Sequence, residues 1–305
     1  MTIRGWLWVI FHVVVVGGLV TDLGLLSRRG AGLTFRQASG RTATWVALAL
    51  AFAGVIAATL GRGPALAFVT GYMTEEALSA DNLVVIVLIF SYLGTPPERQ
   101  AGVLTWGIAG AIVMRGLFIL GGTAALAHFA WVGYVLGALV LASGVRLAVR
   151  GESREGAVAL DRNPVLRAVR RVLPFTTRYD GARLVTRENG RRVGTPLLLA
   201  LLLVEAMDLV FAVDSIPAIF GITRDPMLVY TSNVFAVIGL RSLYVLIARA
   251  ADRLRYLTYG VAIVLIFIGA KMLLFDVVSL STGASLAVVA AVLGAAVAAS
   301  LVFSR

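Results

Sequence analysis

Long apolar runs separated by short polar connections make up nearly all of this 305-residue chain. Most runs are near the ~20 residues that a helix needs to cross the hydrocarbon layer of a membrane. The pattern therefore predicts an all-α polytopic membrane protein with about nine transmembrane helices. The expected spans are residues 5–22, 43–60, 66–93, 102–126, 130–149, 195–220, 227–248, 256–275 and 283–303.

The charged connections between these runs predict the orientation of the chain. Arginines gather after the first, fifth and seventh spans, whereas the connections on the other side hold only Arg4, Arg62 and Arg224. Because positive residues favour the cytoplasmic side, we expect the N-terminus outside and the C-terminus in the cytoplasm. We expect residues 5–22 to stay as a span, because Val20-Thr21-Asp22 is not a small-residue signal cleavage site.

The formal net charge of +11 does not indicate nucleic-acid binding, because the arginines lie where anionic lipid headgroups account for them. Residues 151–194 form the expected basic cytoplasmic loop. Pro164 to Phe175 places apolar residues at helical spacing among arginines, which favours a helix lying on the membrane surface. The segment 150–194 is either a linker or a surface for a cytoplasmic partner.

The two halves of the chain resemble each other, which predicts an internal repeat. Residues 90–96 match residues 220–226 at an offset of 130, which also aligns Glu75 with Glu205. Each repeat holds three spans, an odd number, so the second copy is expected to be inverted, an arrangement typical of transporters. Further matches pair 106–117 with 232–243 and 144–146 with 269–271. The expected units are a two-span segment at 1–62, repeat one at 63–150, the basic loop at 151–194, repeat two at 195–277 and a last span at 278–305.

Acidic residues inside the third and sixth runs are the candidate functional feature. A carboxylate near a bilayer centre costs at least ~2.5–3.5 kcal/mol on insertion scales. Arg115 and Arg241 lie at matching depth, and Lys271 lies near the outer end of its span. These cations cannot neutralise all the acids, so the excess requires protons, bound cations or both. The acids are Glu75, Glu76, Asp81, Glu205, Asp208 and Asp214.

The spacing of the sixth-span acids indicates a site for a hard cation. Glu205 and Asp208 share a helix face. Pro217 cannot donate to the Val213 carbonyl, which is therefore free to act as a ligand near Asp214. Oxygen ligands without cysteine favour manganese, calcium or magnesium over zinc or copper. Further candidate ligands are Asn82, Ser215, Ser232, Asn233 and the Met207 sulfur.

Other roles are open for these charges. The acids could form ion pairs that lock helices together, or they could relay protons without a metal. Arg115 and Arg241 are expected to neutralise and position acids, although contact with an oxyanion substrate is the alternative. The histidines, His12 and His128, lie far from the acidic runs and the chain has no cysteine, so the sequence does not favour an enzyme. A carboxylate-only hydrolase stays as the alternative within that class.

The quoted motifs resemble the TerC family of integral membrane proteins, which includes tellurium-resistance proteins and Alx-like manganese exporters. The resemblance covers residues 4–275 and includes EEALSADN at 75–82 and VEAMDLVFAVDS at 204–215. It implies a bacterial inner-membrane protein, related to LysE-type transporters, that exports manganese(II). The family's acidic motif carries over to Glu76, Asp81, Glu205, Asp208 and Asp214, with Asn82 and Ser215 as polar neighbours. Residue 75 looks variable in the family, which leaves Glu75 as a bystander.

The sequence thus favours divalent-metal efflux, most of all of manganese(II), in exchange for protons and with no organic cofactor. The expected partners are membrane lipids, the metal ion and protons. Tellurium resistance is expected to be indirect, because an acid-lined path repels the tellurite anion. The alternative is a metal-binding membrane scaffold of a stress-resistance system, in which the segment 150–194 recruits cytoplasmic partners.

Overall fold

The computed structural model describes residues 2–28, 33–129, 131–150, 174–188, 190–250, 256–274 and 280–303. The side chains of residues 22–28, 81, 150, 214, 249, 250 and 301 lie outside this description. The described residues form nine α helices and one short β hairpin. The helices are α1 (Ile3–Arg28), α2 (Phe35–Leu60), α3 (Arg62–Tyr92), α4 (Pro97–His128), α5 (Trp131–Arg150), α8 (Pro196–Phe220), α9 (Pro226–Ala250), α10 (Leu257–Leu273) and α11 (Thr282–Phe303).

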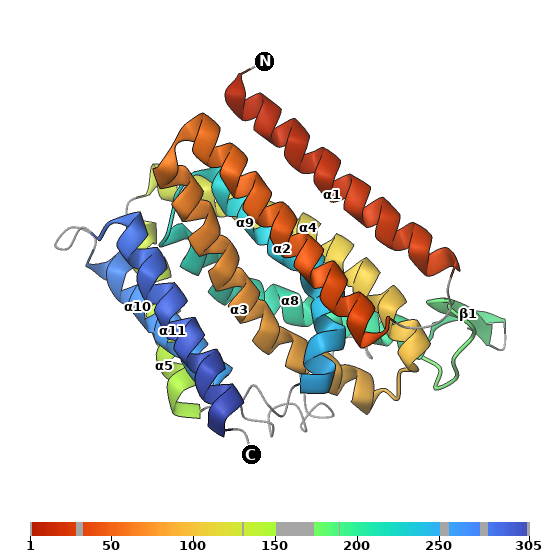
Figure 1. The fold of residues 1–305 in the computed structure, drawn as a ribbon. Coiled ribbons are helices and arrows are strands. Elements are labelled where there is room, and N and C mark those ends of the chain that lie inside the picture. Colours follow the sequence, from red (N-terminus) through yellow and green to blue (C-terminus); the bar gives the residue numbers. More distant parts are fainter. Residues whose placement is uncertain are drawn as a thin grey trace.

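Each helix overlaps one expected span, and the prediction of an all-α polytopic membrane protein is confirmed. Within the described residues, seven helices are long and apolar enough to cross a membrane. The other two are α3, which carries the first group of acids, and α10, which is apolar but has 17 residues. Figure 1 shows the two termini at opposite ends of the bundle, as an odd number of crossings requires.

Short local signals fix where the helices begin and end. Thr34 caps α2, because its hydroxyl accepts from the Gln37 N–H while the Gln37 side chain accepts from the Thr34 N–H. Prolines stand in the first turns of α4 and α8, where the missing N–H has no helical partner to lose. Gly61 and Gly94 have positive φ angles of 95° and 59°, so they make the tight turns before α3 and before α4.

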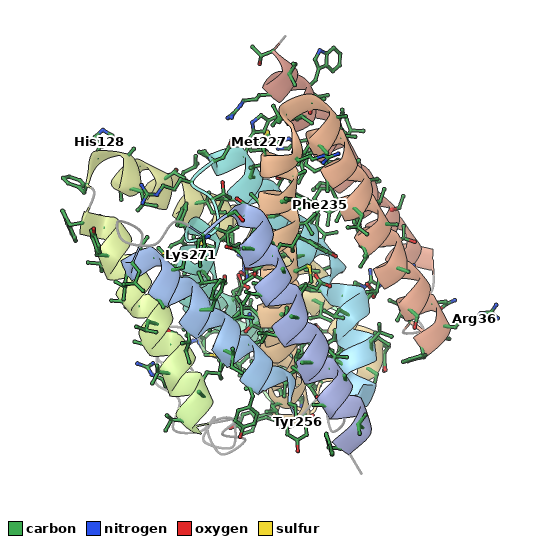
Figure 2. The ribbon with its side chains drawn as sticks, turned by 60° about the vertical axis from the view of Figure 1, so that its left-hand side comes forward. Arg36, His128, Met227, Phe235, Tyr256 and Lys271 are labelled. Carbon is green, nitrogen blue, oxygen red and sulfur yellow. The ribbon has the colours of Figure 1, made fainter. Side chains whose placement is uncertain are left out.

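An aromatic cluster joins the N-terminal helices to the middle of the bundle. Phe11 of α1, Phe52 of α2 and Phe68 of α3 surround Phe235 of α9, with ring centroids 5.4–6.0 Å from it. Figure 2 shows Phe235 inside the bundle, whereas Arg36 and His128 lie at its periphery. The cluster fixes the depth of α9 against α3, which matters because both helices carry polar groups further along.

The helices of the two expected repeats pack across each other rather than within themselves. α3 packs on α9 and α4 packs on α8, while α5 packs on α10. Glycines allow the last pair to touch: a Cβ at Gly144 would lie 2.7 Å from the Ile266 nitrogen, and one at Gly269 would lie 2.5 Å from the Leu141 nitrogen. Small residues at such crossings are typical of membrane helices.

The end of the basic loop forms a hairpin of strands β1 (Val185–Glu188) and β2 (Arg191–Gly194), which pair antiparallel. Tyr179, just before it, donates from its hydroxyl to the Leu93 carbonyl at 2.9 Å. We call residues 174–188 and 190–194 the hairpin segment. Through Tyr179 this segment contacts the turn between α3 and α4. The surface helix predicted for 164–175 falls almost wholly on residues 151–173, outside the described residues, and Phe175 itself bridges to Gly194 instead.

Candidate intramembrane acidic site

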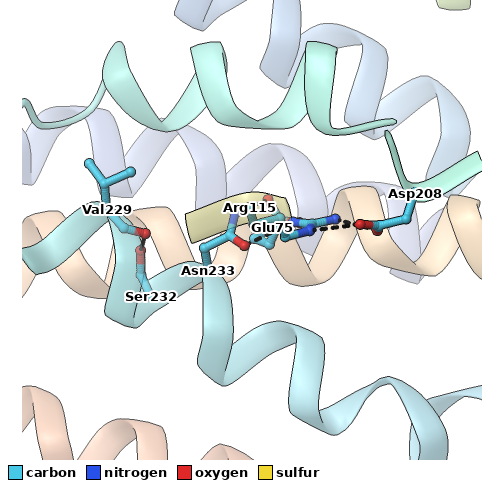
Figure 3. Close-up of polar contacts among 6 residues, drawn as sticks. All are labelled: Glu75, Arg115, Asp208, Val229, Ser232 and Asn233. Carbon is cyan, nitrogen blue, oxygen red and sulfur yellow. Dashed lines mark hydrogen bonds and ion pairs between the residues drawn. The ribbon is translucent and has the colours of Figure 1, made fainter. Parts of the chain in front are cut away.

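Arg115 of α4 forms a buried polar network with three other helices, shown in Figure 3. Its guanidinium forms a fork with Asp208 of α8, at 2.9 Å from Nη2 to Oδ1 and 3.3 Å from Nε to Oδ2. Its Nη1 donates to Glu75 of α3 and, at 3.0 Å, to the Asn233 amide oxygen of α9. Asn233 in turn donates to Glu75 Oε2 at 3.1 Å. We call these four residues the Arg115 network.

The network ties α3, α4, α8 and α9 together at one depth. The side chains of Arg115 and Glu75 are both 0% exposed, and that of Asp208 is 15% exposed. A buried guanidinium is tolerated when its donors reach charged and polar acceptors, as they do here. Ser232, one residue before Asn233, instead donates to the Val229 carbonyl of its own helix at 3.2 Å (Figure 3). The network has two carboxylates against one guanidinium, so it carries a net negative charge when all are ionised.

Glu76, the next residue on α3, has a different environment. Its Oε2 atom is buried and has no hydrogen-bond partner among the described residues. The side chain points toward α9, where Oε1 lies 4.0 Å from the place that a Cβ of Gly239 would occupy. A buried carboxylate oxygen without a donor is costly in either membrane or protein surroundings. Glu76 is therefore a natural place for a proton or a cation.

Glu205 of α8 lies against α4 and not within the Arg115 network. Its carboxylate fills the space beside Gly110, where any larger residue would occupy the same volume. No hydrogen bond to the Glu205 side chain is found within the described part of the chain. The structure thus separates two kinds of acid: Glu75 and Asp208 pair with Arg115, while Glu76 and Glu205 do not.

A small cavity lies beside the network, lined by residues of α3, α4, α8 and α9. Its volume is about 30 Å³, the scale of a single water molecule or ion. Asp208, Asn82 and Ser79 line it together with Met207, and apolar side chains such as Leu104 complete its wall. The Ser79 hydroxyl is buried and lacks a partner among the described residues, as do the hydroxyls of Thr74 and Ser215. We call this space the acidic cavity.

The structure brings some predicted ligands together and leaves others apart. Asp208 and Asn82 meet at the acidic cavity, and Asn233 lies in the network that holds Asp208. Among the described side chains, no group of three or more acidic residues, histidines or cysteines is close enough to hold a metal ion. The reason is that Glu76 faces α9, Glu205 faces α4 and Asp208 is turned toward Arg115.

The remaining predicted site residues fall as follows. Asp81 lies on α3 and Asp214 on α8, but their side chains are outside the described part, so their roles stay predictions. Ser215 is buried, and α8 continues through Pro217, whose missing N–H leaves the Val213 carbonyl without its helical donor. Arg241 is buried on α9, at 6% exposure.

Sequence reasoning set Glu75 aside, yet the structure places it in the network, bound to both Arg115 and Asn233. Two signals could have found it: Glu75 aligns with Glu205 in the internal repeat, and Arg115 needs an acid at the same depth. The hairpin also had a signal, the Asn189-Gly190 dipeptide, which is the strongest short-range mark of a two-residue hairpin turn.

Comparison with known proteins agrees with this architecture. Residues 60–305 match the profile described as the integral membrane protein TerC family. The chain belongs to the TerC family. The family match includes all four helices of the Arg115 network, so that network is part of the family domain in this protein.

Relatives of this TerC family protein match over nearly its full length. An uncharacterized membrane protein, STKORF319, from Myxococcus xanthus is 44% identical over 98% of this chain and 93% of its own. The protein named "Putative membrane-bound redox modulator Alx" from Escherichia coli K12 is 43% identical over 94% of this chain and 91% of its own. The chloroplastic thylakoid membrane protein TERC from Arabidopsis thaliana is 46% identical over 88% of this chain and 69% of its own. No solved structure matches the chain.

Proposed function

We propose that this TerC family protein exports a divalent metal ion, most of all manganese(II), across a bacterial inner membrane in exchange for protons. The observation that carries the proposal is Glu76, whose buried carboxylate oxygen has no partner among the described residues. A second acid, Glu205, likewise lies outside the Arg115 network. A membrane protein keeps such groups when a mobile cation or proton relieves their charge.

In this proposal the acidic cavity is where the ion rests. Asp208 and Asn82 supply carboxylate and amide oxygens, which hard divalent cations prefer. Because Asp208 also pairs with Arg115, an arriving cation competes with the guanidinium for that carboxylate. A complete ligand shell then needs Glu76, Glu205 and the predicted ligands Asp81 and Asp214 to turn toward the ion. Protons returning to these carboxylates release the metal on the outer side.

The packing of the two repeats supports this mechanism. If the repeats are equivalent, α3 corresponds to α8, α4 to α9 and α5 to α10. The observed packing of α3 on α9 then corresponds to the observed packing of α8 on α4. Gly144 and Gly269, which the repeat aligns, each contact the other's helix. We infer that the two repeats are inverted copies related by a pseudo-two-fold axis. Such copies can alternate between inward and outward access around a central site.

The name of the Alx relatives suggests a redox role, which in this chain takes a different form. The 305 residues include no cysteine, so a thiol–disulfide couple within this chain cannot carry redox chemistry. We propose that any redox role of this chain is indirect and acts through the metal that it exports. We propose the orientation given by the arginines, with the N-terminus outside and the hairpin end of the bundle in the cytoplasm.

Metal flux in proteoliposomes tests the proposal. Purified protein is reconstituted with a manganese-sensitive dye inside, and flux is followed with and without a pH gradient. We expect flux in the native protein and its loss in Glu76→Gln and Asp214→Asn. Glu98→Gln is the matched control, because Glu98 is an exposed acid in the first turn of α4 and should leave flux unchanged.

Each result has a defined meaning. Flux that needs Glu76 and the pH gradient supports proton-coupled export, and flux that ignores the gradient removes the coupling. Equal flux in Glu76→Gln and Glu98→Gln would contradict the role of the buried carboxylate. Absence of manganese flux in folded native protein, tested again with calcium and magnesium, would remove the transport function itself.

A further inference from the structure

A second cavity lies at the hairpin end of the bundle, next to the acidic cavity. Its volume is about 210 Å³, and it is formed by the first turns of α4 and the last turns of α9. We call it the entrance cavity. The residues that line it are Leu33, Pro97, Gln100, Ala101, Leu104, Arg241, Tyr244, Val245 and Ala248.

The side chain of Leu104 lines both cavities. It is 4% exposed, so it fills the space between them. On the facing helix, Leu240 lines the acidic cavity and the next residue, Arg241, lines the entrance cavity. On α4 the two cavities are therefore separated by a single residue, and on α9 they are lined by adjacent residues. Apolar constrictions of this kind gate ion pathways because a hydrated ion cannot pass them.

A hydrogen bond joins two residues that line the entrance cavity, one on α4 and one on α9. The Tyr244 hydroxyl of α9 donates to Gln100 Oε1 of α4 at 2.9 Å, and Gln100 Nε2 donates to the Thr95 carbonyl at 2.9 Å. Thr95 belongs to the turn on which the hairpin segment sits, and the Tyr179 hydroxyl lies 3.4 Å from the Thr95 hydroxyl. The Arg99 guanidinium also lies over the Tyr179 ring, 5.2 Å from its centroid. The hairpin segment therefore holds the turn that positions Gln100.

We propose that the entrance cavity is the cytoplasmic access route to the acidic cavity, with Leu104 as its barrier and the Gln100–Tyr244 hydrogen bond as its latch. This inference rests on the proposed export function, for which it names the path of the metal ion. In the structure the route is closed, because Leu104 lies between the two cavities and blocks it sterically. The Gln100 and Tyr244 oxygens offer neutral ligands to an ion that has begun to lose its water.

A thiol placed in the acidic cavity tests the route without any need for transport. The chain has no cysteine, so Ser79→Cys provides a single reporter at a buried residue that lines this cavity and changes only one atom. The small cationic reagent 2-aminoethyl methanethiosulfonate is added on the hairpin side of sealed vesicles, with free cysteine as scavenger on the other side. The labelling rate is then compared between variants that carry the reporter.

We expect slow labelling of the reporter alone and a several-fold faster rate when Leu104→Ala is added. Val103→Ala is the matched control, because Val103 is the neighbouring residue, is 3% exposed and lines neither cavity. Tyr244→Phe, which removes the latch, should give a smaller acceleration. If Leu104→Ala prevents folding, Leu104→Val makes the same comparison with a smaller loss of volume.

Two results would overturn the access route. One is that the Leu104 variant labels no faster than the Val103 control. The other is that the acceleration occurs only when the reagent is on the side away from the hairpin. Failure of the export function is distinguishable, because labelling can rise in Leu104→Ala even where no metal flux is found. Conversely, normal metal flux with no effect of Leu104 on labelling would remove the access route alone.

Discussion

Glu75 and Glu76 are neighbours in the chain, yet their side chains have different environments in the bundle. A helix turns by about 100° per residue, so the two side chains of α3 leave it in different directions. Glu75 is fully buried and accepts hydrogen bonds from Arg115 and Asn233. Glu76 also has a buried oxygen, but that oxygen has no partner among the described residues.

This difference in hydrogen bonding indicates a different role for each kind of buried acid. An acid with complete hydrogen bonds joins helices, and its removal leaves its partners without acceptors. An acid without a partner is not stabilised by hydrogen bonds in the folded state, and its charge can be neutralised by a mobile cation or proton. By this criterion Glu75 and Arg115 hold the bundle together, whereas Glu76 and Glu205 are the acids that we assign to the proposed transport. Asp208 belongs to both, because it binds Arg115 and lines the acidic cavity.

The largest effect should come from removing the cation of the network. Arg115→Met leaves Glu75 and Asp208 buried without their guanidinium, and breaking a buried pair in this way costs about 3–5 kcal/mol. We expect a matching loss in the free energy of unfolding in mixed detergent micelles. Arg62→Met is the control, since Arg62 is exposed at the start of α3 and should cost little. Equal losses in the two variants would show that the network does not hold the helices.

A smaller effect on the free energy of unfolding should distinguish Glu75 from Glu76. Glu75→Gln removes a charge that Arg115 needs and should cost about 1–3 kcal/mol, the range for a disrupted buried hydrogen bond. Glu76→Gln removes an unpaired charge and should leave the unfolding free energy equal or higher. The same detergent unfolding experiment measures both variants. A greater loss of stability in Glu76→Gln than in Glu75→Gln would reverse the assignment of the two roles.

The helices were predictable from the sequence because the lipid environment leaves the backbone few choices. Every spanning segment must satisfy its own hydrogen bonds, so a run of about 20 apolar residues becomes a helix. The hairpin at 185–194 lies outside that constraint. In that segment the arginines led to the prediction of a basic loop. The turn of the hairpin was indicated only by the Asn189-Gly190 dipeptide.

The site was predictable in kind but not in pairing. The excess of acids over cations follows from counting residues in the apolar runs, and Arg115 was expected to position acids. Which acids it binds depends on how each helix is rotated about its axis. The low amphipathicity of these helices gives no signal for that rotation, because lipid and protein interior are both apolar. Glu75 was set aside because residue 75 looks variable in the family, and no signal of helix rotation showed that it faces Arg115.

The smallest effect on stability should come from moving Glu205. Gly110→Ala places a methyl group where the Glu205 carboxylate lies, and the long side chain can turn aside. The expected change in unfolding free energy is under about 1 kcal/mol, because alanine's better helix propensity offsets part of the strain. Gly102→Ala is the matched control on the same helix, since nothing lies within 4 Å of a Cβ there. If Glu205 belongs with Glu76 to the transport chemistry, manganese flux falls in Gly110→Ala and not in Gly102→Ala. Equal flux in the two variants would place Glu205 outside the path of the ion and leave Glu76 and Asp208 as the described acids assigned to it.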